Sequence, residues 1–182
     1  MKTEMVPSYG FGAAAASLVT RAEGLLASVP RSLPLLALRF ALAIPFFKSG
    51  LTKWDGFLTL SSGARYLFEQ EFKLHVFGSA VAYPFPLTMA TAAGIGELVL
   101  PILLILGLAT RFAALGLLLM TAIIQLTIPD GWANFHLPWA AMALALVVFG
   151  GGKIAVDPFV FAAPQMTRRP HASSPRGGAQ PG

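Results

Sequence analysis

Four long apolar segments dominate this sequence and restrict the folds that it can adopt. They cover residues 33–53, 86–109, 112–128 and a stretch that begins at 133 or 137 and ends at 150. Each is close to the roughly 20 residues that an α-helix needs to cross a hydrocarbon core about 30 Å thick. A chain with 55% hydrophobic and only 12% charged residues is also too apolar for an ordinary soluble domain. The sequence therefore predicts an all-α protein, a four-transmembrane-helix bundle in a lipid bilayer.

Two segments of different character flank this membrane domain, which we predict over residues 33–158. In residues 1–32, the apolar side chains that share one helical face are Leu18, Ala22, Leu25, Leu26 and Val29. Because the preceding apolar stretch is mostly alanine, it is a poor secretion signal, and we expect an uncleaved helix at the membrane interface. Residues 159–182 are rich in Pro, Gly and Ser, and we expect them to form a disordered cytoplasmic tail.

The distribution of Lys and Arg predicts the orientation of the bundle. The side that holds both termini and the turn at 110–111 carries Lys2, Arg21, Arg31, Arg111, Lys153, Arg168, Arg169 and Arg176. The opposite side has fewer, and acidic residues dilute them. Cytoplasmic flanks are enriched in positive residues, so both termini are predicted to be cytoplasmic. The loops at 54–85 and 129–136 then face outward, and residues 64–77 of the first loop mix apolar and charged side chains, which predicts a short amphipathic surface helix.

Composition excludes several classes of function. The chain has no cysteine, which rules out disulfides, thiol chemistry, iron–sulfur clusters and covalent c-type haem. The net charge of +5 is spread over tails and loops instead of one patch, which argues against nucleic-acid binding. No complete catalytic motif is present, so the sequence leaves open whether the chain is an enzyme, and any redox role needs a borrowed cofactor.

Three charged residues, Arg39, Lys48 and Glu97, lie inside apolar segments. An ionised group there costs at least about 2.5–3.5 kcal/mol on insertion scales, so each needs compensation. Helical phase puts Arg39 and Lys53 on one face of the first segment and Lys48 on the opposite face. We expect Arg39 to reach toward Glu97, which lies near the centre of the second segment.

Two further residues are expected near Glu97. Gln125 lies at a depth similar to that of Glu97, and Pro101 leaves the carbonyl of Glu97 without its helical donor. Arg39, Lys53, Glu97 and Gln125 are therefore candidates for a shared ligand or proton site. The alternative is that these polar groups only hold the helices together, at about 0.6 kcal/mol each.

The loops supply weaker candidates. His136 is a candidate for proton relay or for contact with a ligand headgroup, and Trp132 and Trp139 beside it fit either that role or an aromatic belt. Arg111 and Asp157 are interface or structural candidates. Glu71 and His75, four residues apart, are weak candidates for a metal site, because two ligands alone seldom hold an ion.

These residues together resemble the DoxX family of small bacterial membrane proteins. The matching pieces are Arg39 leading to Gly50-Leu-Thr-Lys53, Glu97 followed by Pro101 and by Leu106-Gly-Leu-Ala-Thr-Arg111, and Gly150-Gly-Gly-Lys-Ile-Ala-Val-Asp157. The resemblance covers residues 35–157, most of the chain. Lys48 departs from the apolar or small residue expected before the Gly50 motif. His136-Leu-Pro-Trp139 after Ile128-Pro129 resembles a subset of the family whose genes lie beside those for metal-responsive modified peptides and their iron-dependent maturation enzymes.

The resemblance implies a four-helix bundle in the bacterial inner membrane and an association with membrane redox chemistry. Relatives include the large subunit of thiosulfate:quinone oxidoreductase and a component that links thiol metabolism to superoxide detoxification. A family does not by itself transfer an activity. No cysteine here can act on sulfur directly.

The sequence leaves three classes of function open. The first is an accessory or quinone-interacting membrane subunit of a redox or stress-response system. The second is a non-catalytic anchor or assembly partner in metal or oxidative-stress handling, which binds another membrane or periplasmic protein. The third is a small-solute or proton transporter, which four helices without an inverted repeat would support only as a homo-oligomer.

Overall fold

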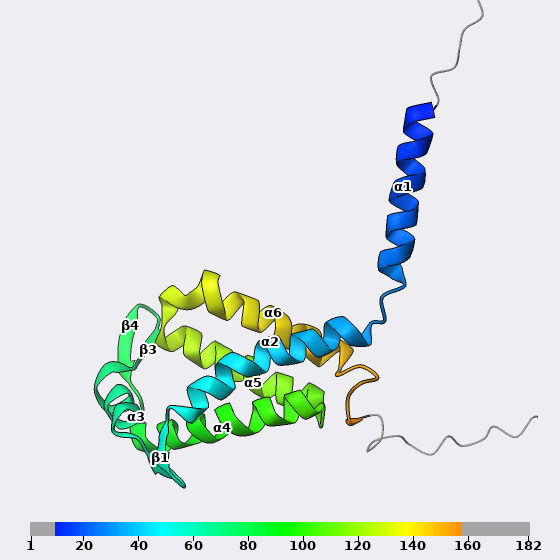
Figure 1. Cartoon of the computed structure of the whole chain (residues 1–182). Coiled ribbons are helices and arrows are strands. Elements are labelled where there is room, and N and C mark those ends of the chain that lie inside the picture. The colour runs from blue at the N-terminus through cyan, green and yellow to red at the C-terminus, as the bar shows by residue number, and fades with distance from the viewer. Residues whose placement is uncertain (1–9, 158–182) are drawn as a thin grey trace, which may run out of the picture.

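The computed structural model describes residues 10–157. Four long helices run side by side (Figure 1), namely α2 (Ser32–Leu51), α4 (Pro86–Leu106), α5 (Thr110–Thr127) and α6 (Leu137–Phe149). The first three are long and apolar enough to cross a membrane, and so is the fourth when the helical turns before α6 are included, over Pro129–Phe149. The predicted bundle of four apolar helices is confirmed.

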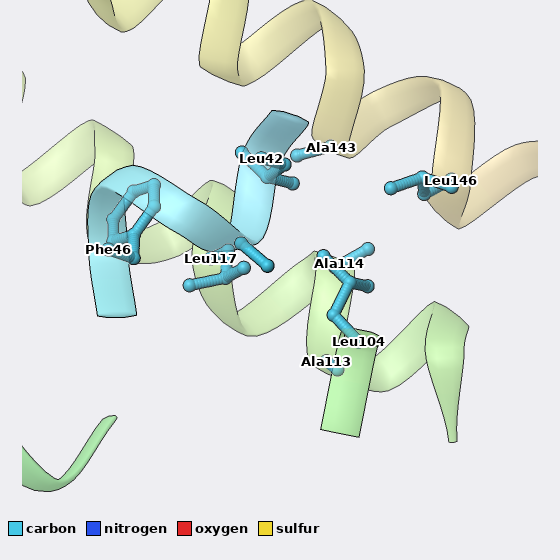
Figure 2. Packing of buried hydrophobic residues seen from close by; sticks show 9 residues of the cluster. Leu42, Phe46, Leu104, Ala113, Ala114, Leu117, Ala143 and Leu146 are labelled. Carbon is cyan, nitrogen blue, oxygen red and sulfur yellow. The ribbon is translucent and has the colours of Figure 1, made fainter. Parts of the chain in front are cut away.

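The four helices close into a ring in which each packs on the next. α2 packs mainly on α4, α4 on α5, α5 on α6, and α6 returns to α2. The buried core of this ring combines leucines with alanines, whose small side chains let neighbouring helices approach. Figure 2 shows its members Leu42, Phe46, Leu104, Ala113, Ala114, Leu117, Ala143 and Leu146. The outward faces are apolar as well, with Val99, Leu119 and Val148 all exposed, as expected of helices that contact lipid.

The connection between α4 and α5 is as short as the sequence suggests. At the end of α4, the N–H of Leu108 donates to the carbonyl of Leu103 and the N–H of Gly107 to that of Leu104. This pattern closes a helix with its last carbonyls satisfied. Because α5 begins at Thr110, α4 and α5 must be antiparallel neighbours.

The N-terminal helix α1 (Gly10–Ala27) stands apart from the bundle. Figure 1 shows it projecting away from the start of α2, and residues 12–27 are exposed along their whole length. The predicted N-terminal helix is therefore present, and its apolar side chains Leu18, Leu25 and Leu26 are unburied. The predicted tail at 159–182 lies outside the described residues.

The first outer loop differs in part from the expected surface helix at 64–77. Helix α3 (Ser62–Tyr66) and the π-helical turn η1 (Leu67–Glu71) confirm its first half. The second half is instead a hairpin of β3 (Lys73–Val76) and β4 (Ser79–Ala82). Phe77 and Gly78 both adopt positive φ, 49° and 78°, which is the geometry of a two-residue hairpin turn. The expectation of a helix through residue 77 was wrong, because the turn at Phe77 and Gly78 lets residues 73–76 pair with residues 79–82 as strands.

A second, smaller hairpin precedes α3 and consists of β1 (Trp54–Gly56) and β2 (Thr59–Leu60). On the other side of the ring, the short turns η2 (Pro129–Gly131) and η3 (Trp132–His136) lead into α6. The hairpins and α3 gather at one end of the bundle, whereas α1 and the last described residues lie at the opposite end (Figure 1). We call these the loop end and the terminal end.

Candidate ligand-binding cavity

A buried ion pair joins α2 to α4 toward the loop end. Lys53 Nζ lies 2.6 Å from Glu97 Oε2, and this is the one ion pair within residues 10–157. The same Nζ lies 3.2 Å from Ser49 Oγ, one turn earlier on the chain. Glu97 is 5% exposed. An ammonium group has three N–H donors, so this arrangement leaves one of them for a further partner.

Gly50 is the reason that these two side chains can meet. A Cβ atom added at Gly50 would lie 3.0 Å from the Cβ of Glu97 and 2.9 Å from Leu98 Cδ2. The backbones of α2 and α4 are thus as close as a residue without a side chain allows. Nearby, the indole of Trp54 packs directly against Gly94 of α4, and its Nε1 has no hydrogen-bond partner among the described residues.

Both members of the ion pair line an open cavity of about 790 Å³, to which all four bundle helices and the first outer loop contribute residues. Most of its wall is apolar or aromatic, including Phe46, Phe68, Phe72, Met120, Ile124 and Trp139. Its polar side chains are few and come from Ser49, Lys53, Tyr83, Glu97, Thr127, Asp130 and His136. A cavity of this size with an apolar wall and a few convergent polar groups is typical of a small-molecule site.

His136 forms the second polar part of the cavity wall. Its Nδ1 lies 2.6 Å from Gln125 Oε1, so α5 holds the start of α6 through this pair. Trp139 packs beside the imidazole, with ring centroids 5.6 Å apart, and also contacts Phe46 and Phe135. Trp132 is exposed, as an aromatic side chain at a membrane boundary would be.

The first outer loop covers the loop end of the cavity and is fastened to α5. Tyr83 Oη lies 2.5 Å from Thr127 Oγ1, and His75 Nδ1 lies 3.1 Å from the carbonyl oxygen of Leu126. Phe68 packs between Phe72 and Tyr83, with centroid distances of 5.3 and 5.6 Å. The loop therefore contributes aromatic surface to the cavity.

The weak metal candidates do not share a site. Glu71 accepts a hydrogen bond of 3.1 Å from Tyr66 Oη, whereas His75 contacts α5. The bond to Glu71 and the charge of that carboxylate raise the pKa of Tyr66 above its ordinary value. In the part of the chain that the structure describes, His, Asp and Glu form no group of three that could hold an ion.

Arg39 occupies a different place from the one expected. Its guanidinium donates to the carbonyls of Leu104, at 2.7 Å, and of Ile105, in the last turn of α4, and to those of Gly151 and Ile154 at 3.4 Å. The last carbonyls of a helix lack intrahelical donors, which explains the attraction. Arg39 is 1% exposed and makes no ion pair with Glu97. The expected approach of Arg39 to Glu97 is therefore corrected: Arg39 belongs to the terminal end.

Asp157 completes the contacts at the terminal end. Its carboxylate accepts hydrogen bonds of 2.5 and 2.9 Å from the backbone N–H groups of Ala109 and Thr110, at the start of α5. A carboxylate there accepts from N–H groups that have no partner inside the helix, and it interacts favourably with the positive end of the helix dipole. Arg111 is exposed and makes no hydrogen bond within residues 10–157, which fits an interface position. Pro101 is buried inside α4, which continues through it.

The structure thus brings together part of the expected site and adds residues to it. Lys53, Glu97 and His136 line the cavity, while Gln125 supports His136 from behind. Sequence reasoning missed Ser49 and Tyr83. The spacing of four residues between Ser49 and Lys53 could have revealed the first. Tyr83 carried no such pattern, because its position depends on the fold of the outer loop.

Comparison with known proteins agrees with this architecture. The model of the DoxX family matches residues 34–130. A protein of Haemophilus influenzae described as uncharacterized is 31% identical over 140 residues, which is 69% of this chain and 82% of that protein. No solved structure matches the chain.

Proposed function

The chain belongs to the DoxX family of membrane proteins, and we propose that its cavity binds a lipid-soluble carrier of the quinone class. In this proposal the protein is an accessory membrane subunit of a redox or stress-response system. It lies in the bacterial inner membrane with both termini in the cytoplasm. The observation that carries the proposal is the ion pair of Lys53 and Glu97 on the wall of a large apolar cavity.

The chemistry of the wall fits such a carrier better than a water-soluble ligand. A quinone ring presents two flat apolar faces and oxygens at opposite ends. Aromatic side chains such as Phe46 and Trp139 suit the faces, and the spare N–H of Lys53 suits an oxygen. Charged residues kept inside a membrane protein, where they are costly, more often mark a ligand or proton site than a scaffold.

The orientation rests on two observations. The described chain begins and ends at the same end of the bundle, as four crossings require (Figure 1). That terminal end carries the excess of Lys and Arg, which favours the cytoplasm. The cavity then opens toward the periplasmic half of the membrane, and α1 lies along the cytoplasmic interface.

Purification in mild detergent with extraction of bound lipids tests the proposal. Wild-type protein should retain a quinone in a fixed ratio, and Glu97→Gln and Lys53→Gln should lose most of it while still inserting. Lys48→Gln is the matched control, because Lys48 lies on the exposed face of α2 and does not line the cavity. Absence of quinone from the wild type, or equal occupancy in all four proteins, would contradict the proposal.

One observation favours a second candidate function, that of an assembly partner. Phe57 and Phe77 lie at the tips of the two hairpins at the loop end and are almost fully exposed, Phe57 at 95%. Exposed aromatic side chains are enriched at protein interfaces. Crosslinking in native membranes should capture another membrane or periplasmic protein, and Phe57→Ser with Phe77→Ser should abolish this. Phe112→Ser, an equally apolar exposed position at the terminal end, is the control.

A further inference from the structure

The side-chain amide of Gln125 has a defined orientation. Its Nε2 donates to the carbonyl oxygen of Pro129 at 3.1 Å, and its Oε1 lies 2.6 Å from His136 Nδ1. Rotating the amide by half a turn would place two acceptor oxygens against each other at Pro129. The oxygen of Gln125 therefore faces His136, and an amide oxygen can only accept a hydrogen bond.

This orientation fixes the tautomer of His136. Since Gln125 Oε1 can only accept, Nδ1 of His136 must carry the proton that is shared between them. A neutral imidazole has one N–H and one bare nitrogen. The bare nitrogen of neutral His136 is then Nε2, which can only accept.

Nε2 of His136 lies on the side of the ring near Gly131, and both residues line the cavity. This nitrogen has no hydrogen-bond partner within residues 10–157, and it is not among the enclosed polar atoms that lack one. His136 lines the cavity, and its ring is held between Trp139 and the backbone of Gly131. The cavity thus contains a positioned acceptor at His136 and, from another helix, a positioned donor at Lys53.

We infer that the cavity selects the reduced, hydroxyl-bearing form of its carrier, a hydroquinone, over the oxidised quinone. One hydroxyl of the hydroquinone donates to His136 Nε2, and the oxygen at the opposite end of the ring accepts from Lys53. The oxidised form has carbonyl oxygens at both ends, so one of them would face the lone pair of Nε2. This inference rests on the proposed function, because it assigns the redox state of the same ligand.

Equilibrium binding to protein in nanodiscs, under anaerobic conditions, tests the inference. The probes are a short-tailed benzoquinone, its hydroquinone, and the dimethyl ether of that hydroquinone, which has the same ring and tail but no hydroxyl donor. The hydroquinone should bind about tenfold more tightly than either of the others, the effect of gaining one good hydrogen bond and avoiding one acceptor–acceptor contact.

Variants assign this preference to His136. His136→Phe should reduce the ratio of the dissociation constants to near unity. Gln125→Leu removes the hydrogen bond that fixes the tautomer of His136 but no residue of the cavity wall, so it should reduce the ratio in part. Asn134→Ala, at an exposed position of the same segment, should keep the wild-type ratio.

The possible results separate the two proposals. Equal affinity for the three probes, or a preference that survives in His136→Phe, would overturn the selection of the hydroquinone and leave the carrier site intact. A wild-type protein that binds none of the probes would overturn the proposed function as well. Tighter binding of the oxidised form would contradict the assigned tautomer directly.

Discussion

Lys53, two residues beyond the end of α2, forms an ion pair of 2.6 Å with Glu97, which lies near the middle of α4. The pair ties the loop end of α2 to the interior of the bundle. It also places both charges on the cavity wall, where a ligand can reach them. The stability of the bundle and the binding of the ligand should therefore respond to the same two residues in different ways.

Removing one member of this pair should destabilise the protein more than removing both. Lys53→Gln leaves a buried carboxylate without its partner, and breaking a buried pair in this way costs about 3–5 kcal/mol. The double variant Lys53→Gln with Glu97→Gln should recover much of that loss. Thermal unfolding in detergent measures the stability of the wild type, the two single variants and the double variant, with Lys48→Gln as the control. Additive losses in the double variant would show that the two residues act independently.

The close approach of α2 and α4 at Gly50 should tolerate no side chain. In Gly50→Ala, the new methyl group would lie 3.0 Å from both the carbonyl carbon and the Cβ of Glu97, so the helices must move apart. We expect a loss of about 1–3 kcal/mol, the usual cost of overpacking. Gly63→Ala in α3 has no atom within 4 Å of the added Cβ and serves as the control. Equal unfolding temperatures for the two variants would refute this view of the interface.

Arg39 should act on stability and not on ligand selection. Arg39→Lys keeps the charge but cannot match the planar fork that reaches the carbonyls of Leu104 and Ile105. We expect a loss of about 2–3 kcal/mol, since bonds from a charged donor contribute roughly that much. The variant that still folds should bind the hydroquinone with wild-type preference. A change of preference without loss of stability would place Arg39 in the site after all.

Helix α1 should lie at the membrane surface with its leucine face in the lipid. The chain has no cysteine, so a single cysteine carries a unique label. A polarity-sensitive fluorophore at Leu25→Cys should report an apolar environment in vesicles, and the same label at the exposed Thr20→Cys, opposite the apolar face of the helix, should report water. Similar spectra at both positions would mean that α1 is not inserted in this way.

The sequence predicted the positions of the helices better than the contacts between polar groups of different helices. The four apolar runs follow from their length, and the helical period places Arg39 and Lys53 on one face of the first run. These rules do not say which polar groups of another helix lie opposite. Arg39 was expected near Glu97, but the unpaired carbonyls at the end of α4 lie closer to it. Lys53 meets Glu97 instead, because the shift of α2 along α4 depends on packing at Gly50.

The same limit explains the outer loop and His136. Alternation at Lys73–Val76 and the turn at Phe77 and Gly78 indicate a hairpin, yet the apolar and charged residues nearby also fit a surface helix. His136 stood out as a residue at the start of the last segment, and Gln125 as one inside the third. Only the packing of α5 against η3 shows that they bind each other.

Photolabelling tests the central claim, that a quinone-class carrier occupies the cavity, most directly. A photoreactive quinone analogue, crosslinked in native membranes and mapped by mass spectrometry, should attach to cavity residues such as Phe46, Met120 and Trp139. Excess unlabelled carrier should prevent the reaction. Labelling spread over the lipid-facing side chains Val99, Leu119 and Val148, and unchanged by competition, would contradict the account.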